Sequence, residues 1–123
     1  MESPYKGETG LKRILNAARN SLEGLAAAAR HEDAFRQELI IAAVLIPTAF
    51  FLNVDLLEKA MLIGSILLVL IVELLNSAVE ATVDRISFED HHLAKRAKDI
   101  GSAAVMLSLV NAGVVWLLIV ILR

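Results

Sequence analysis

Three long stretches of this chain carry no charged residue, and they constrain its fold more than any other feature. They cover residues 39–54, 60–72 and 100–122. A hydrocarbon core about 30 Å thick needs about 20 apolar residues in a helix, so each stretch with its flanks predicts a membrane span. Hydrophobic residues make up 57% of the 123-residue chain, more than a soluble domain of this size usually contains. The surplus is therefore expected to face lipid.

The predicted fold is all-α, with one membrane-embedded domain over residues 1–123. The transmembrane helices are expected at about 35–54, 60–83 and 100–122, joined by a tight connection at 53–59 and a polar loop at 84–99. Apolar residues recur at helical spacing over 11–31, opposite a basic face. This pattern is typical of an amphipathic helix in the headgroup plane. An ordinary helix packed on a soluble core is the alternative.

Lysine and arginine are distributed unevenly around these spans. They concentrate in the N-terminal segment and in residues 84–99, whereas the 53–59 connection has only Lys59 and the C-terminus only Arg123. Basic residues favour the cytoplasmic side, so the N-terminus and the 84–99 loop are predicted to be cytoplasmic. The polar N-terminus lacks the apolar core of a signal peptide, so we expect the first span to act as the insertion signal.

Composition excludes several function classes. The net charge is −2 and no basic stripe dominates, which argues against nucleic acid as a partner. Cysteine is absent, so the chain has no disulfide frame, thiol nucleophile or thiolate metal site. His91 and His92 are adjacent in the 84–99 loop, and we interpret them as loop residues without a dedicated metal role.

A polar face interrupts the second span. Glu73, Asn76 and Glu80 stand at i, i+3 and i+7, so they project from one side of a helix. A carboxylate inside a membrane costs on the order of 3 kcal/mol by insertion scales, and such a residue is usually sheltered and functional. Glu73 lies about 10 Å deeper than Glu80 along a regular helix. An interhelical hydrogen bond is the simpler role for Glu73.

Three spans and a surface helix can bring a larger polar set to one cytoplasmic pocket: Glu32, Glu73, Asn76, Glu80, Lys98 and Asp99. Phosphoryl transfer requires oxygen ligands for a divalent cation, basic groups for phosphates and a carboxylate that accepts a proton. The set contains all of these. The sequence has no P-loop and no kinase-type glycine loop, so motifs of that kind leave the function open. Glu32 could equally be a solvated residue, and Asp84 and Arg85 a boundary ion pair.

Three ordered segments add a family resemblance that covers about residues 10–115. Residues 32–38 (EDAFRQE), 72–85 (VELLNSAVEATVDR) and 96–105 (RAKDIGSAAV) resemble the bacterial integral-membrane diacylglycerol kinase family. The resemblance implies a homotrimer of three-span subunits in the bacterial inner membrane, with active sites between subunits. It also implies a magnesium-dependent enzyme that makes phosphatidic acid from diacylglycerol and MgATP.

The resemblance also implies roles for individual residues. In the family Glu73 corresponds to the proton acceptor for the lipid hydroxyl, and Glu80 and Glu32 to the carboxylates that hold magnesium. The full candidate set is Glu73 and Asn76 for catalysis; Arg13, Asn20, Glu32, Glu80, Glu89, Asp90, His91, Lys98 and Asp99 for ATP; Arg13, Ser21, Phe35, Arg36, Gln37, Glu38, Glu73 and Ser102 for substrate; and Glu32 and Glu80 for metal. At Asn20 this chain departs from the aromatic residue usual in the family.

Three other functions compete with this interpretation. Undecaprenol kinase shares the architecture and the Glu-Leu-Leu-Asn core, although residues 35–38 resemble the diacylglycerol branch more. A small proton-coupled multidrug antiporter also uses a membrane glutamate, but it predicts four spans where this sequence offers three. A non-enzymatic assembly or anchoring protein is the third alternative.

Overall fold

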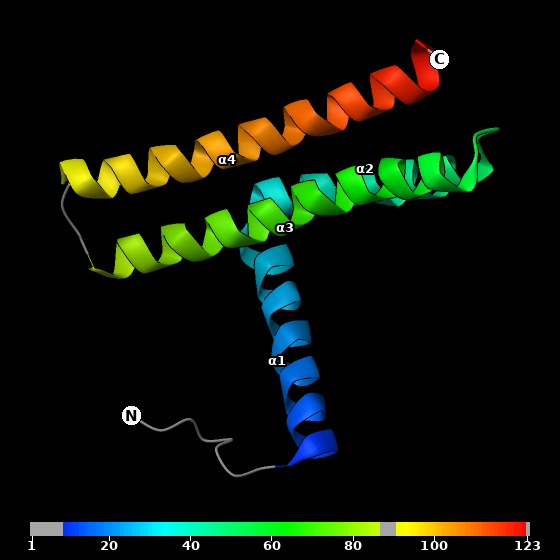
Figure 1. The fold of residues 1–123 in the computed structure, drawn as a ribbon. Helices are drawn as coiled ribbons and strands as arrows, with labels where there is room; N and C mark the ends of the chain where they lie inside the picture. Colours follow the sequence, from blue (N-terminus) through cyan, green and yellow to red (C-terminus); the bar gives the residue numbers. More distant parts are fainter. Residues whose placement is uncertain (1–8, 87–90, 123) are drawn as a thin grey trace.

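A computed structural model describes residues 9–86 and 91–122. Over these residues the fold is entirely helical, as predicted (Figure 1). The elements are α1 (Gly10–His31), α2 (Asp33–Phe51), α3 (Leu56–Ile86) and α4 (His92–Trp116), and α4 continues into a five-residue π-helix, η1 (Leu117–Ile121).

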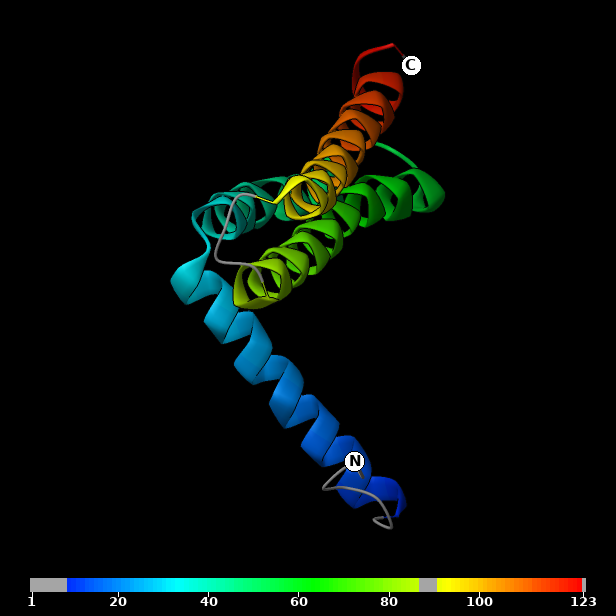
Figure 2. The same ribbon diagram turned by 90° about the vertical axis from the view of Figure 1, so that its left-hand side faces the viewer.

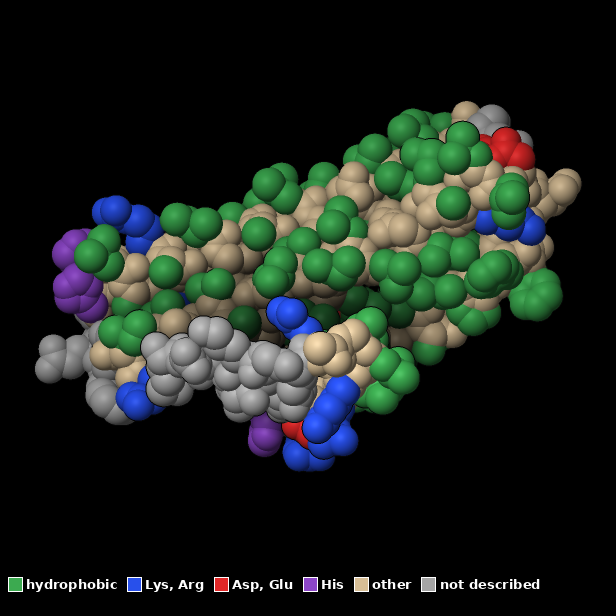
Figure 3. All heavy atoms as spheres, turned by 60° about the horizontal axis from the view of Figure 1, so that its bottom comes forward, with side chains coloured by type: hydrophobic (Ala, Val, Ile, Leu, Met, Phe, Trp, Pro, Cys, Tyr) green, Lys and Arg blue, Asp and Glu red, His purple; other side chains and the backbone are tan. Residues whose placement is uncertain are grey.

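Three helical units are long and apolar enough to cross a membrane: α2, α3, and α4 with η1. The prediction of three membrane-length helices is confirmed, with different bounds. In the space-filling view of Figure 3, charged side chains gather at the two ends of this bundle and around α1, and hydrophobic side chains cover the length between. α3 has 31 residues, which is about 46 Å at a rise of about 1.5 Å per residue. It therefore exceeds a hydrocarbon core of about 30 Å.

The prediction of a polar loop over 84–99 is wrong for most of its length. α3 continues through Asp84 and Arg85, and α4 begins at His92. His91 is the N-cap of α4, and its Nδ1 accepts a hydrogen bond from the Leu93 amide at 3.1 Å. Beyond it, Lys95 and Asp99 pair at 2.6 Å along the helix. Polar composition was mistaken for a loop, although capping and i,i+4 pairing stabilise an exposed polar helix.

The tight connection between the first two spans is confirmed, and it is shorter than predicted. Asp55 and Glu58 form a reciprocal cap: the Glu58 amide donates to Asp55 Oδ1 at 2.8 Å, and the Asp55 amide donates to Glu58 Oε1 at 3.2 Å. This capping box satisfies two amides at the start of α3. Lys59 Nζ donates to the Phe50 carbonyl at 2.7 Å, which satisfies an acceptor at the end of α2.

The bundle packs most tightly around the first half of α3. Leu62 is fully buried there beside Ala49 of α2 and Ile119 of η1. Trp116 packs against the same cluster, and its indole N–H lies 3.2 Å from Ser65 Oγ and 3.3 Å from the Leu62 carbonyl. Trp116 is therefore a packing residue.

α1 runs away from the bundle and across its long axis (Figures 1 and 2). None of its residues is buried, and Leu11, Ile14 and Leu22 are each about two-thirds exposed. Arg36 secures the junction with α2, because one guanidinium nitrogen donates to the carbonyls of Ala29 and Arg30 at 3.0 and 2.8 Å. An ion pair with Asp33 completes this arrangement.

Candidate active site

The polar face of α3 is buried within the chain. Glu73, Asn76 and Ser77 are 6%, 8% and 9% exposed, and α3 packs against both α2 and α4. The spacing of Glu73, Asn76 and Glu80 had placed them on one face, and this face points into the bundle. The protein thus shelters these polar groups from lipid, as a polar residue in a membrane requires.

Asn76 connects the buried polar face of α3 to Glu80, the acid nearer the end of the helix. Its Nδ2 donates a hydrogen bond to Glu80 Oε1 at 2.8 Å. Its Oδ1 is buried and has no hydrogen-bond partner among the described residues. That oxygen lies against α4 at Gly101, where an added Cβ would overlap it. α3 and α4 therefore meet at a position that only glycine leaves open.

Four carboxylates from three parts of the chain lie close enough for their charges to interact. Glu73 interacts with Glu80 on its own helix, with Glu32 at the α1–α2 junction and with Glu38 on α2. One Glu38 carboxyl oxygen, Oε2, is buried and lacks a hydrogen-bond partner within the described chain. Among residues 9–86 and 91–122, no lysine or arginine forms an ion pair with this acidic group. Four negative charges close together repel one another and destabilise the fold unless a cation offsets them.

Lys98 and Asp99, two candidates for ATP, lie nearer the α3–α4 connection. Lys98 Nζ is 2.5 Å from Asp84 Oδ1, in an ion pair that joins α4 to α3. Asp99 is engaged by Lys95 and lines a different, shallow depression with His92 and Arg96. Adjacent residues on a helix diverge by about 100°, so Lys98 and Asp99 take different faces of α4. The structure thus brings Glu32, Glu73, Asn76 and Glu80 together, and it turns Asp99 toward another surface within this single chain.

A groove of about 700 Å³ runs between α1 and α3 beside the acids. It is mostly apolar, with Leu25 and Leu74 in its walls. Its polar groups come from Ser21, His31, Glu32 and Ser77. Ser21 and Glu32 were both candidates from sequence. An apolar groove with a few polar groups at one side is the usual form of a site for an amphipathic ligand.

The remaining candidates are scattered. Arg13 and Asn20 are exposed on α1, Gln37 is exposed on α2, and Ser102 is exposed on α4. Phe35 is 1% exposed and packs inside the bundle. Glu89 and Asp90 lie outside the described residues.

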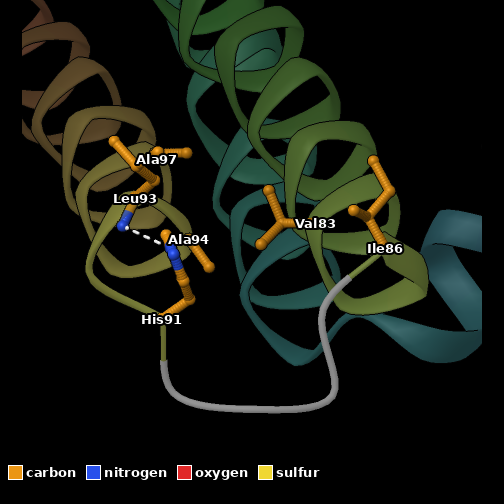
Figure 4. Close-up of a pocket in the computed structure, with 6 residues that line it drawn as sticks. All are labelled: Val83, Ile86, His91, Leu93, Ala94 and Ala97. Carbon is orange, nitrogen blue, oxygen red and sulfur yellow. Dashed lines mark hydrogen bonds between the residues drawn. The ribbon is translucent and has the colours of Figure 1, made fainter.

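A second groove, of about 470 Å³, opens between the ends of α3 and α4 (Figure 4). Val83 and Ile86 of α3 face Ala94 and Ala97 of α4, and His91 lies at the mouth beside the connection. The His91 and His92 rings stack with centroids 4.5 Å apart. Of the ATP candidates, His91 therefore lies beside an apolar space large enough for a flat ring.

Sequence reasoning missed three contacts. It did not place Glu38 with Glu73, did not pair Lys98 with Asp84, and did not place Arg36 against the last carbonyls of α1. Contacts between helices depend on their relative rotation and depth, which a single sequence does not specify.

Known proteins resemble this chain over nearly its whole length. The family model for prokaryotic diacylglycerol kinase matches residues 19–120. The chain belongs to this family. A diacylglycerol kinase of Pseudomonas aeruginosa is 59% identical over 114 residues, 93% of each chain. Those of Haemophilus influenzae and Escherichia coli are 50% and 49% identical over 108 residues, 88% of this chain and 92% and 88% of theirs. The predicted family and the prediction of a kinase are confirmed.

Proposed function

We propose that the chain transfers the γ-phosphate of MgATP to the hydroxyl of diacylglycerol and so makes phosphatidic acid. The observation that carries the proposal is the buried carboxylate of Glu73, grouped with three other acids beside the second half of a membrane-length helix. The apolar groove beside them suits a lipid acceptor. The names of the relatives support diacylglycerol in particular.

In this reaction Glu73 is the general base. A Glu73 carboxylate oxygen accepts the proton of the acceptor hydroxyl while the hydroxyl oxygen attacks the γ-phosphorus. A bond forms between that oxygen and phosphorus, the bond from the γ-phosphorus to the β–γ bridging oxygen breaks, and ADP leaves. Burial suits Glu73 for this role, because excluded water cannot compete as acceptor. Asn76 orients the acidic face through its bond to Glu80.

The acidic group offers the oxygen donors that a magnesium ion takes, although no three acids of the described residues converge to enclose one. Carboxylate oxygens are the ligands that magnesium prefers in phosphoryl-transfer sites. Glu80 and Glu32 would hold it, because both interact with Glu73 and neither forms an ion pair with a basic side chain among the described residues. When bound, the ion offsets negative charge on the phosphates. This leaves Glu73 to take the proton.

Basic side chains would hold the nucleotide. Lys98 lies at the α3–α4 interface, a helical turn or more beyond Glu80 toward the connection, and would contact phosphate. His91 stands beside the apolar groove of Figure 4, which would take the base. Asp99 faces another surface of this chain, and the resemblance alone assigns it to the sugar. Arg13 on α1 would reach both phosphate and lipid, as the resemblance implies.

α1 is proposed to lie in the headgroup plane of the bacterial inner membrane, with the α3–α4 connection in the cytoplasm. Its exposed leucines and isoleucine, and its direction across the bundle axis (Figure 1), support that position. Three copies would form the working enzyme, with active sites between subunits. A mass of three chains for the purified protein, after correction for bound detergent, is the expected result, and a monomer with full activity would contradict it.

A lipid phosphorylation assay tests the function. The purified protein in mixed micelles with MgATP should convert diacylglycerol to phosphatidic acid, with ADP released in equal amount. Undecaprenol serves as the competing acceptor. Faster phosphorylation of undecaprenol would overturn the acceptor assignment, and ADP release that does not depend on added lipid would overturn the lipid kinase itself.

A further inference from the structure

The orientation of the Asn76 amide is fixed by what surrounds it. A carboxylate only accepts hydrogen bonds, so the atom that faces Glu80 has to be the amide nitrogen, as the 2.8 Å contact has it. The amide oxygen must then point the other way. That oxygen is buried and finds no hydrogen-bond partner in the described chain, so no polar contact holds it in place.

Gly101 supplies the space in which this oxygen lies. A Cβ built on Gly101 would overlap Asn76 Oδ1 and lie 3.3 Å from Asn76 Cγ. Its nearest neighbours within 4 Å all belong to Asn76. The other helical glycine of α4, Gly113, has nothing within 4 Å of such an atom. The need for glycine at 101 therefore comes from the Asn76 amide and not from general crowding between helices.

We infer that Gly101 is a positioning residue for the metal ligand Glu80. By leaving room for Asn76 Oδ1 against α4, Gly101 allows Asn76 Nδ2 to hold one Glu80 oxygen and direct the other toward the cation. This inference rests on the proposed function, because it takes Glu80 as a magnesium ligand. Groups that orient a ligand in this way typically change metal affinity about 10- to 100-fold when they are replaced.

The expected effect of Gly101→Ala follows from this geometry. The added methyl group displaces the amide oxygen, the bond to Glu80 lengthens, and Glu80 loses its fixed direction. Half-maximal binding of a fluorescent ATP analogue, measured without any lipid acceptor, should then need about tenfold more Mg²⁺. Gly113→Ala is the matched control on the same helix and should leave the Mg²⁺ requirement unchanged.

A double variant shows whether the effect passes through Asn76. Asn76→Ala removes the amide, so adding Gly101→Ala to it should cause no further rise in the Mg²⁺ requirement. A merely structural role for Gly101 predicts additive effects and a lower melting temperature instead. An unchanged Mg²⁺ requirement in folded Gly101→Ala, or additive effects in the double variant, would overturn the inference.

A spectroscopic test covers the case in which Gly101→Ala does not fold. In protein labelled with ¹⁵N-asparagine, the Asn76 side-chain signal is identified by its loss in Asn76→Ala. Glu80→Ala should shift this signal because the amide loses its acceptor, and an unmoved signal would overturn the inference. Neither readout requires lipid turnover. Failure of the lipid kinase assignment would leave nucleotide binding intact, so the two failures are distinguishable.

Discussion

The first half of α3 buries polar atoms only with partners, whereas the second half buries one, Asn76 Oδ1, that has none among the described residues. Ser65 donates to the Leu62 carbonyl at 2.8 Å and lies 3.2 Å from the Trp116 indole N–H. Asn76 Oδ1 on the second half has no such partner in the described chain, and Glu73 lies there among three other acids.

The difference separates a supporting region of this helix from the region that we propose to be reactive. Satisfied polar groups and a fully buried Leu62 stabilise the bundle without chemistry of their own. Unsatisfied groups and clustered acids cost stability, and proteins retain them where a ligand or a reaction uses them. Substitutions in the first half should therefore affect stability, and those in the second half should affect turnover.

The largest expected effect is that of Glu73→Gln. Glutamine keeps the shape of the side chain but cannot accept the proton from the acceptor hydroxyl, so turnover should fall by at least about 100-fold. The affinity for MgATP and the melting temperature should not fall, because the substitution removes one of four neighbouring negative charges and so reduces their repulsion. Turnover in the lipid assay and binding of a fluorescent ATP analogue measure the two properties.

Glu58→Gln is the control for this result, on the same helix but in the first half. Its carbonyl oxygen can still accept from the Asp55 amide, since glutamine serves in a capping box as glutamate does. Turnover should stay unchanged. A normal rate in Glu73→Gln would remove Glu73 from the role of base.

Leu62→Ala should have the largest effect on stability. Leu62 is fully buried between α2 and η1, and its truncation leaves a cavity that costs about 2 kcal/mol. This loss in the free energy of unfolding is at the low end for a leucine-to-alanine change. Lipid surrounds the helices in the unfolded state too, so the transfer of the side chain out of water does not contribute. Unfolding in mixtures of dodecyl sulfate and a mild detergent measures it. Leu67→Ala, at a half-exposed position of α3, should cost much less, and equal costs would contradict a core at Leu62.

Ser65→Ala should lower the free energy of unfolding by about 1 kcal/mol, less than Leu62→Ala does. The loss is small because the Trp116 N–H keeps the Leu62 carbonyl as an acceptor. Trp116 is the single tryptophan of the chain, so its emission reports directly on the change and should shift. Ser108→Ala is the control, since Ser108 Oγ donates only along its own helix, to the Val105 carbonyl at 2.7 Å. An unchanged emission spectrum in Ser65→Ala would contradict the hydrogen bond between the Trp116 indole and Ser65.

The sequence was sufficient for the helices and for the polar face, because both follow from local periodicity. The spacing of Glu73, Asn76 and Glu80 fixed their common side, and the uncharged stretches fixed three apolar helices. The ends of α3 and α4 were missed, since the cap at His91 depends on one side-chain contact. The proximity of Glu38 to Glu73 and of Gly101 to Asn76 depends on how α2 and α4 are rotated against α3, and local periodicity does not determine that rotation.

The smallest expected effect is that of Asp84→Asn, at the exposed end of the reactive half. Asp84 and Lys98 pair at 2.5 Å, but their side chains are 63% and 42% exposed, so water and salt weaken the attraction. The free energy of unfolding should change by less than about 0.5 kcal/mol, and the same detergent titration measures it. Lys98→Met is the companion variant: it should be equally mild for stability yet raise the KM for ATP, because Lys98 is the proposed phosphate contact. A large loss of stability in Asp84→Asn would mean that this pair supports the bundle, and that the division between the two halves of α3 ends before Asp84.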